Sequence, residues 1–547
     1  MSKRRTKKRR GSKSPYSHHN ISGIDQHKRH GSKLSPPLAQ FPISVASSWS
    51  DSHMPEMLWA VLLTEVMERD TYLDCFRHVT VLAREWFKQE ESGTEEIEQP
   101  TNDDQGINFT IVVDHTKLAA ISDDRFEQFI SILLRPALGY AALRPLLLIE
   151  ALPGLERWRR RLSVSTTEDD WNTLARAVAG VLDHQSEAST DIRWFKVMVP
   201  SYAGRLQYPR SMADHVENLR LFPNRGDMRQ VRPQIRSTEM MLRRTPSSEW
   251  IEHFWTEIFE KTQCFDPSTD RYRPVESAID QQSLYRVRSQ VISRFEGAMR
   301  ANRVDPRLDS SFGLVLYSLA IAEEIRFNLV QTRIIGRVAL RAIVEANITL
   351  RYLFAKDNDA LWLSYRVYGA GQAKLAFLKA QEFEGELPSF MDEDALYAIA
   401  NEDKWQEFLD IDVGHWANSN LRKLATESGA KELYDKYYDW SSTYVHGHWG
   451  AVRDSNFVTC HNPLHRLHRI PRVWQRRLNS VESDVIGLIN QMLEMLDDKF
   501  AGPTPFDKLT ISDGRSRSTG AETSAANTPD ASTVKPPSAA DDSIDRT

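Results

Sequence analysis

The chain of 547 residues has only three cysteines and no long hydrophobic segment. Cys75, Cys264 and Cys460 are an odd number and lie far apart, which is typical of a reduced cytoplasmic protein and disfavours a disulfide framework. The longest apolar stretch, residues 312–322, is about half of the ~20 residues that a membrane-spanning helix needs. We therefore predict a cytoplasmic protein without membrane contact.

Several motifs that mark large enzyme classes are also missing. The chain contains no G-x-x-x-x-G-K-[ST] loop, no G-x-G-x-x-G turn after a strand, no H-E-x-x-H and no paired C-x-x-C. These absences disfavour nucleotide hydrolases and dinucleotide-dependent dehydrogenases. We predict that the protein uses no cofactor.

Charge is distributed unevenly along the chain. The formal net charge is −5, but residues 1–40 carry +10 and the remainder therefore carries −15. Because residues 1–40 contain almost no apolar side chains, we predict a disordered basic tail, and we predict a second disordered tail at 501–547. The basic run at 3–10 could bind RNA or another polyanion, act as a nuclear-import signal in a eukaryote, or only aid solubility.

Residues 41–245 are predicted to form an α-rich domain with a small β element. Hydrophobic periodicity predicts helices at 55–68, 72–87, 123–134, 140–151 and 168–184. Thr167 followed by Asp170 resembles a capping box at the start of the last helix. The β-branched runs at 109–113 and 192–199 are candidate strands.

Residues 246–500 are predicted to form a multi-helix bundle, so the fold class is mainly α. Thr245 followed by Pro246 is typical of a cap residue before a proline at the first helical position. Apolar residues at i, i+3, i+4, i+7 and i+8 then predict a helix through 249–261. Similar patterns occupy 276–302, 308–329, 331–355, 360–383, 393–409, 418–446 and 478–500. No fixed repeat period supports a solenoid.

One predicted helix carries a stripe of charge. Arg333, Arg337, Arg341 and Glu345 are each four residues apart, so they share one helical face within an otherwise apolar segment. Buried arginines need partners. The stripe is therefore either a phosphate or carboxylate site in which Glu345 holds Arg341, or a buried ion-pair network with acids elsewhere.

A second segment, residues 434–449, is rich in aromatic residues and ends in two histidines. Ser442 and His446 lie one helical turn apart, and Gly447 and Gly450 mark the helix end. No oxyanion hole or nucleophile elbow accompanies them, so a polar, aromatic-lined pocket is favoured over serine hydrolysis. A histidine at a helix C-terminus is also stabilised by the helix dipole alone.

A third cluster combines Cys460 with His461, His465 and His468. His465 and His468 could share a helical face, but Pro463 interrupts the helix and only one thiol is present, so no familiar zinc spacing is met. Zinc-dependent hydrolysis is the functional alternative and a polar loop the structural one. We predict no metal.

Residues 205–244 hold nine arginines and no lysine. This local positive charge could bind a phosphate backbone, or it could dock against the acidic second domain. Because the folded body is strongly negative, docking is favoured.

Three motifs between 310 and 500 resemble a known bacterial family. An R-x-x-x-E helix at 336–345, a Tyr-rich helix at 365–368 and a final Ser-x-x-x-His at a helix end are similar to those of the domain-of-unknown-function family DUF5677. The resemblance implies an all-helical domain, distantly similar in layout to HEPN domains, many of which are RNases in toxin and antiphage systems. The HEPN catalytic signature places Arg four to six residues before His, and no Arg stands there before His446.

These observations combine into one functional hypothesis. A helical centre binds a phosphate-bearing ligand such as RNA, with His446, Arg341 and Glu345 as catalytic residues and Arg337, Tyr365, Ser442 and Tyr444 as ligand-binding residues. The hypothesis requires Arg341 or Arg337 to reach His446 through the fold. The alternative is a non-catalytic interaction or scaffold protein whose polar centre is structural; a homodimer is compatible with both.

Overall fold

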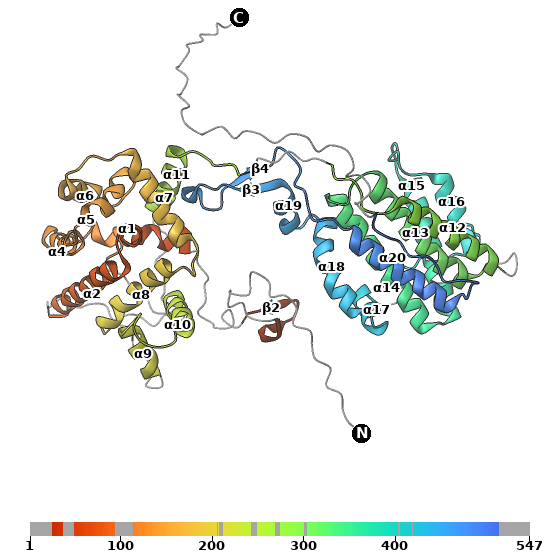
Figure 1. Ribbon diagram of the computed structural model, residues 1–547, viewed down its shortest axis with the longest axis horizontal. Coiled ribbons are helices and arrows are strands. Elements are labelled where there is room, and N and C mark those ends of the chain that lie inside the picture. Colours follow the sequence, from red (N-terminus) through yellow and green to blue (C-terminus); the bar gives the residue numbers. More distant parts are fainter. Residues whose placement is uncertain are drawn as a thin grey trace, which may run out of the picture. The chain divides into compact units, whose positions relative to one another are not determined.

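The fold is described from a computed structural model of the whole chain (Figure 1). The structure describes residues 24–36, 49–92, 113–204, 206, 212–241, 249–267, 274–299, 304–402, 405–417 and 419–512. Within these residues the protein is mainly α, as predicted. No single described helix is both long and apolar enough to span a membrane, although the bent pair Asp123–Leu134 and Gly139–Leu148 meets that test by length and composition.

The chain forms two compact units. The first unit comprises Met1–Thr269 and Phe457–Pro471, and the second comprises Asp270–Asn456 and Arg472–Thr547. The sequence analysis predicts the domain boundary at 245/246, whereas in the structure the first unit extends to Thr269. The first unit also includes the later segment Phe457–Pro471. The reason is that the 249–261 helix packs in the first unit's core, where Phe254 and Ile258 are fully buried.

The first unit is built from helices (Figure 1). Aromatic side chains contribute much of its core. The Trp59 ring meets Phe76, Phe129 and Phe195 edge-on, with ring centroids 5.1–5.9 Å apart. Its helices are α1 Leu58–Val66, α2 Arg69–Ser92, α3 His115–Leu118, α4 Asp123–Leu134, α5 Gly139–Leu143, α6 Leu155–Leu162, α7 Glu168–Leu182, α8 Glu187–Tyr202, α9 Ala213–Arg220, α10 Met228–Met241 and α11 Glu249–Lys261. The capping box at α7 is confirmed: the Thr167 backbone N–H donates to Asp170 Oδ2 at 2.6 Å.

The prediction of a strand at 192–199 was wrong. These residues lie inside α8, where every side chain from Ser189 to Pro200 is buried. A helix that is buried on all sides shows no amphipathic period, so a short apolar run cannot be distinguished from a buried strand. The other candidate strand, 109–113, lies almost entirely outside the described residues.

The described strands form two small antiparallel sheets. The strand β1 Lys28–His30 pairs with β2 Lys33–Ser35 within the predicted basic tail. The strand β3 Phe457–Thr459 pairs with β4 Arg469–Pro471, with Thr459 opposite Arg469. The second hairpin belongs to the first unit, and its loop carries the 3-10 turn η8 Pro463–His465. Leu464 from this turn joins the first unit's core.

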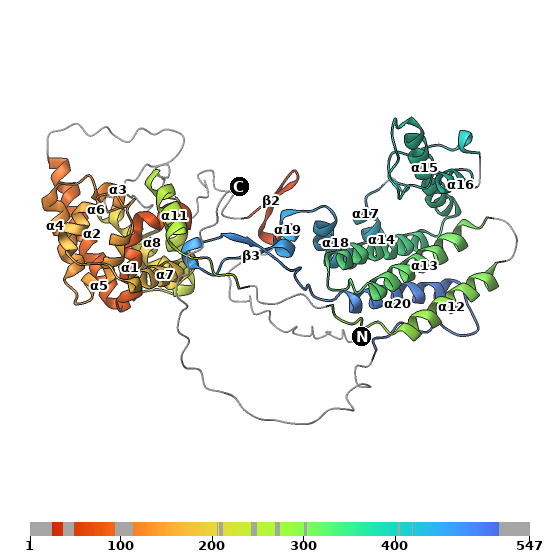
Figure 2. The same cartoon turned by 90° about the horizontal axis from the view of Figure 1, so that it is seen from above.

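The second unit is a helical bundle centred on α14 (Figure 2). α14 packs against α13, α17, α18 and α20. The helices are α12 Gln281–Ala298, α13 Pro306–Phe327, α14 Ile334–Lys356, α15 Asp359–Glu382, α16 Glu393–Ala400, α17 Leu421–Glu427, α18 Lys431–Val445, α19 Trp449–Asn456 and α20 Glu482–Lys499. The predicted helix 418–446 is divided into α17 and α18 at Gly429, whose φ of 72° ends α17.

Part of the predicted C-terminal tail belongs to the second unit's core. Phe506 and Leu509 are buried there. The Leu509 backbone N–H donates to Asn490 Oδ1 at 2.8 Å, and Ile511 forms a bridge with Ile279. Two apolar side chains in a polar stretch were enough to dock this segment. The remaining residues, 513–547, lie outside the described residues.

Candidate functional site

The polar centre proposed from sequence lies in the second unit, on three helices. Arg337, Arg341 and Glu345 lie on α14, while Ser442 and Tyr444 lie on α18, which packs against α14. His446 is the C-cap residue of α18. Tyr365 lies on α15, and Arg333, the other member of the charged stripe, is the N-cap residue of α14.

Arg341 is the most buried charge of this centre. Its side chain is 9% exposed, it forms an ion pair with Glu345 one turn on, and its guanidinium carbon lies 3.6 Å from the centre of the Tyr438 ring. Glu345 is 45% exposed, so the pair spans the edge of the α14–α18 interface. The Nε atom of Arg341 is buried and has no hydrogen-bond partner among the described residues. Arg341 therefore forms an ion pair within α14 and joins α14 to α18 by its contact with the Tyr438 ring.

Arg337 ties the start of α14 to the backbone around it. Its Nη1 donates to the Gln331 carbonyl at 3.2 Å, and its Nη2 donates to the Asn479 carbonyl. Burial lowers the pKa of Arg337, and the neighbouring Tyr444 acts in the opposite direction. The Tyr444 hydroxyl in turn donates to Asp454 at 3.4 Å. The Arg337 guanidinium is therefore hydrogen-bonded to two backbone carbonyls of the second unit.

His446 lies at the exposed end of α18. Its backbone N–H donates to the Ser442 carbonyl at 3.1 Å, and its ring stacks on His448 with centroids 5.7 Å apart. Among the described residues, no hydrogen bond or ion pair joins the His446 side chain to Arg341, Glu345 or the Ser442 hydroxyl. The structure thus places His446 and Arg341 on neighbouring packed helices, α18 and α14, without a hydrogen bond between their side chains.

Tyr365 is held by aromatic packing. Its ring lies 5.1 Å from that of Trp416, which also contacts Tyr352 of α14. Burial raises the pKa of Tyr365, and Tyr317 adds to this shift. The hydroxyl is therefore neutral at physiological pH.

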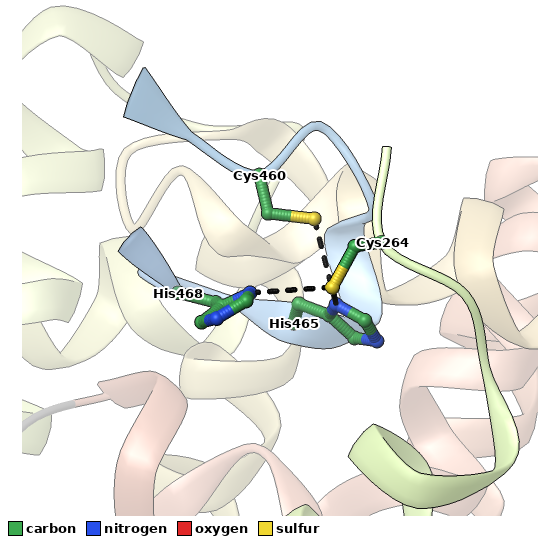
Figure 3. A group of neighbouring side chains, drawn as sticks. All are labelled: Cys264, Cys460, His465 and His468. Atoms are coloured by element: carbon green, nitrogen blue, oxygen red, sulfur yellow. Dashed lines mark hydrogen bonds between the residues drawn. The ribbon is translucent and has the colours of Figure 1, made fainter. Parts of the chain in front are cut away.

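A different cluster brings four ligand-type side chains together in the first unit (Figure 3). Cys264, Cys460, His465 and His468 each turn one sulfur or nitrogen atom toward the others, and these atoms all lie within 4.8 Å of one another. The His465 Nδ1 lies 3.4 Å from each sulfur, and the His468 Nδ1 lies 3.5 Å from Cys264 Sγ. We call this the Cys/His group.

Local structure explains how these four residues meet. Cys264 follows the end of α11, Cys460 follows β3, His465 ends η8, and His468 precedes β4. The hairpin closes the loop, since the Cys460 N–H donates to the His468 carbonyl at 2.9 Å. The loop joins the Cys264 segment through the His461 N–H, which donates to the Phe265 carbonyl at 2.9 Å.

A hydrogen-bond network around the Cys/His group fixes the His465 tautomer. The Thr262 hydroxyl donates to the Ile258 carbonyl at 2.8 Å, so its oxygen can only accept from His465 Nε2, which lies 2.9 Å away. Asn462 Nδ2 also donates to this oxygen, at 3.2 Å. The His465 proton therefore resides on Nε2, and the Nδ1 lone pair faces the two sulfurs.

The sulfur of Cys460 also accepts two backbone hydrogen bonds. The N–H groups of Phe265 and Asn462 lie 3.3 and 3.4 Å from it. Burial raises the pKa of Cys264, and the nearby Cys460 adds to this shift. Burial lowers the pKa of His465, and His468 acts in the same direction. Two backbone donors are thus aimed at one sulfur.

Sequence reasoning found three members of this group and missed Cys264. Cys264 precedes His465 by 201 positions, so no spacing pattern could connect them. The only available signal was that Cys264 follows a helix end predicted correctly at residue 261.

The arginines of the 205–244 stretch that the structure describes pair within the first unit. Arg220 and Arg225 contact Glu217, Arg229 contacts Asp227, and Arg232 contacts Glu187. Docking of this stretch against the acidic second domain stays a prediction.

Comparison with known proteins confirms the family resemblance over part of the chain. Residues 313–463 match the model of a family of unknown function, DUF5677. No curated protein and no solved structure matches the chain. The matched segment runs from α13 to η8 and includes every residue of the polar centre.

Proposed function

We propose that this chain is a non-catalytic interaction protein whose polar centre is structural and whose basic N-terminal segment recruits a polyanion such as RNA. One observation carries the first half of the proposal. The guanidinium groups of Arg337 and Arg341 are directed to acceptors and to an aromatic face inside the unit, and among the described residues His446 forms no hydrogen bond or ion pair with either. An RNase needs an imidazole and a phosphate-binding group at the same phosphodiester.

The second half rests on charge. Residues 3–10 contain seven basic side chains, and a polyanion bound there would release counterions. An acidic body attached to this segment would repel nucleic acid elsewhere, so binding would be confined to the segment.

A test of catalysis uses purified full-length protein and single-stranded RNA. We expect intact RNA with the wild type, His446→Ala and His448→Ala. The two histidines stack on each other and are both exposed, which makes His448→Ala a matched control. Cleavage that disappears in His446→Ala and persists in His448→Ala would overturn the proposal.

A test of recruitment measures RNA affinity against salt concentration. Replacing the seven basic residues of 3–10 with glutamine should abolish binding and the salt dependence together, because each phosphate contact contributes a slope of about −0.7 for single strands. Unchanged binding in this variant would reject the basic segment as the RNA-binding element.

An RNase-like or phosphate-binding enzyme of a toxin or defence system is the second candidate. It is favoured by the buried Arg341 Nε, a donor without a partner among the described residues, which an anionic oxygen could accept from. In that case the Arg341→Met variant would bind RNA more weakly than the wild-type chain does. The structural role predicts that both bind RNA equally well.

A further inference from the structure

We propose that Cys264, Cys460, His465 and His468 bind one Zn²⁺ ion in a tetrahedral site that fastens the β3–β4 hairpin to the end of α11. This inference concerns the first unit and does not depend on the function proposed for the second. It assigns chemistry to two cysteines and two histidines that the polar centre does not use.

The first argument is the donor set. Thiolate sulfur and imidazole nitrogen are the ligands of structural zinc sites, and a Cys₂His₂ set satisfies the metal's preference for four ligands. Because all four positions are filled by protein atoms, no position remains for a reactive water molecule. The site is therefore structural, and zinc-dependent hydrolysis is not what it supports.

The second argument is distance. A tetrahedron with Zn–S of about 2.3 Å and Zn–N of about 2.0 Å has N···S edges of roughly 3.5 Å. Three of the four N···S distances of the group are 3.4, 3.4 and 3.5 Å (Figure 3), and all four ligand atoms lie within 4.8 Å of one another. These three pairs of atoms already lie at the separation that a shared ion requires.

The third argument concerns the atoms around the ligands. Zinc-bound imidazole usually donates its second N–H to a fixed acceptor, and here Thr262 accepts from His465 Nε2 at 2.9 Å. Two backbone N–H groups point at Cys460 Sγ, which stabilises the negative charge of a zinc-bound thiolate. These partners orient His465 Nδ1 and Cys460 Sγ for one common ion.

The fourth argument is what the ion would achieve. The chain passes between the units at 269/270, 456/457 and 471/472, so the hairpin returns to the first unit for only fifteen residues. Besides the Cys/His group and the hydrogen bonds of His461 and Asn462, the contacts of the hairpin loop include the buried Leu464 and Arg466. Arg466 pairs with Asp51 and lies over the Trp255 ring at 4.3 Å. A metal ion would add strong bonds to this short attachment and close a long loop.

The test measures zinc in full-length protein kept under reducing conditions. Metal content is determined on the purified chain, and affinity is determined by titrating metal-free protein with Zn²⁺ against a chromophoric chelator. We expect one Zn²⁺ per chain. Loading with Co²⁺ should give the visible absorption of tetrahedral cobalt with a thiolate charge-transfer band.

Two variants and one control make the result specific. Cys264→Ser and His468→Ala change side chains that are not fully buried, so the fold should survive. Each variant should weaken Zn²⁺ binding by more than about 100-fold. This loss exceeds the one expected when a hydrogen-bond partner of a ligand is removed. His461→Ala is the matched control because His461 lies in the same loop, is exposed and is not a member of the group.

The outcomes divide cleanly. Stoichiometric zinc in the wild type and His461→Ala, with loss in both ligand variants, supports the site. Wild-type affinity no higher than that of Cys264→Ser, or a Cys264–Cys460 disulfide in protein purified under reducing conditions, overturns it.

Discussion

The first unit brings two thiols and two imidazoles together at hydrogen-bonding distance, whereas the second unit matches each arginine of its polar centre with an acceptor or an aromatic ring. In the Cys/His group, four ligand atoms lie within 4.8 Å of one another, and no charged side chain forms an ion pair with them among the described residues. In the polar centre, Arg341 has Glu345 and Tyr438, and Arg337 has two carbonyls. Both clusters are polar and partly buried, but they differ in charge balance.

This difference indicates what each cluster needs. Buried donors and acceptors that satisfy one another require no ligand and contribute to the fold. Electron-pair donors that converge at chelating distance need a proton or a metal cation between them. Charge balance therefore separates a structural cluster from a binding cluster more reliably than residue type does.

Metal removal should have the largest effect and should act on the first unit alone. If free Zn²⁺ stands about 1,000-fold above its Kd, binding stabilises the folded unit by about 4 kcal/mol, which corresponds to a Tm shift of roughly 10 °C. Differential scanning calorimetry of the wild type with and without a chelator measures this shift.

The control for this experiment is Cys264→Ser, in which the chelator should leave the Tm unchanged. The transition of the second unit should not move in either protein. If the chelator leaves both unfolding transitions of the wild type unchanged, the Cys/His group does not stabilise the first unit by binding a metal ion.

Arg341→Met should give the next largest effect, and in the second unit. The change removes the ion pair with Glu345 and the contact with Tyr438, and we expect a loss of about 2 kcal/mol. Glu345→Gln keeps the aromatic contact and changes a half-exposed carboxylate, so it should cost less than about 1 kcal/mol. Thermal or urea unfolding compares the two variants.

An unchanged Tm for Arg341→Met together with weaker RNA binding would reverse the assignment. It would mean that the guanidinium is held for an anion instead of for the fold.

Much of the fold could be predicted from amphipathic period alone. The predicted helices at 123–134 and 249–261 agree with α4 and α11, because each has one buried and one exposed face. Prediction from the amphipathic period was wrong for α8, where all faces of the helix are buried. It also missed the break between α17 and α18, which a single residue, Gly429, produces.

The candidate sites were less predictable because they depend on contacts between distant segments. Sequence could place Arg341 and Glu345 on one face, since they are four residues apart, and the ion pair between them agrees with that placement. It could not place Tyr438 over Arg341 or bring Cys264 beside His465. Both contacts join separate elements, and spacing carries no information about them.

A third test uses pH to distinguish the units. One carboxylate oxygen of Asp114 is buried without a partner among the described residues, and burial raises the pKa of Asp114 to about 8, a shift opposed by Lys196. Burial lowers the pKa of the adjacent His115 to about 4. Both groups are thus neutral in the folded first unit near pH 6.

The signs follow from proton counts in each state. Folded Asp114 keeps a proton that the unfolded chain loses above pH ~4, so its contribution to stability falls as pH rises to about 8. Unfolded His115 holds a proton up to pH ~6.5 that the folded state lacks, so its contribution rises over that range. Between pH 6.5 and 8 only the first effect remains.

The first unit should therefore lose up to about 2 kcal/mol between pH 6.5 and 8, measured on zinc-loaded protein as a falling Tm. Asp114→Asn should remove that slope, and the second unit gives an internal reference in the same scan. A slope that persists in Asp114→Asn would show that another group carries it.

The smallest expected effect tests whether the outer hydrogen bond of the Cys/His group serves the metal. Thr262→Val keeps the shape of the side chain and removes the oxygen that accepts from His465 Nε2. The His465 ring then loses its fixed tautomer, and Zn²⁺ affinity should fall about tenfold, or about 1.4 kcal/mol. Thr256→Val is the matched control, because both hydroxyls donate to the carbonyl four residues earlier in or at the end of α11. Chelator competition compares the two. Equal affinities would mean that the Thr262 hydroxyl serves only the helix end. A loss of affinity confined to Thr262→Val would show that this hydrogen bond orients His465 for the ion, whereas the contacts of Arg341 in the second unit serve the fold.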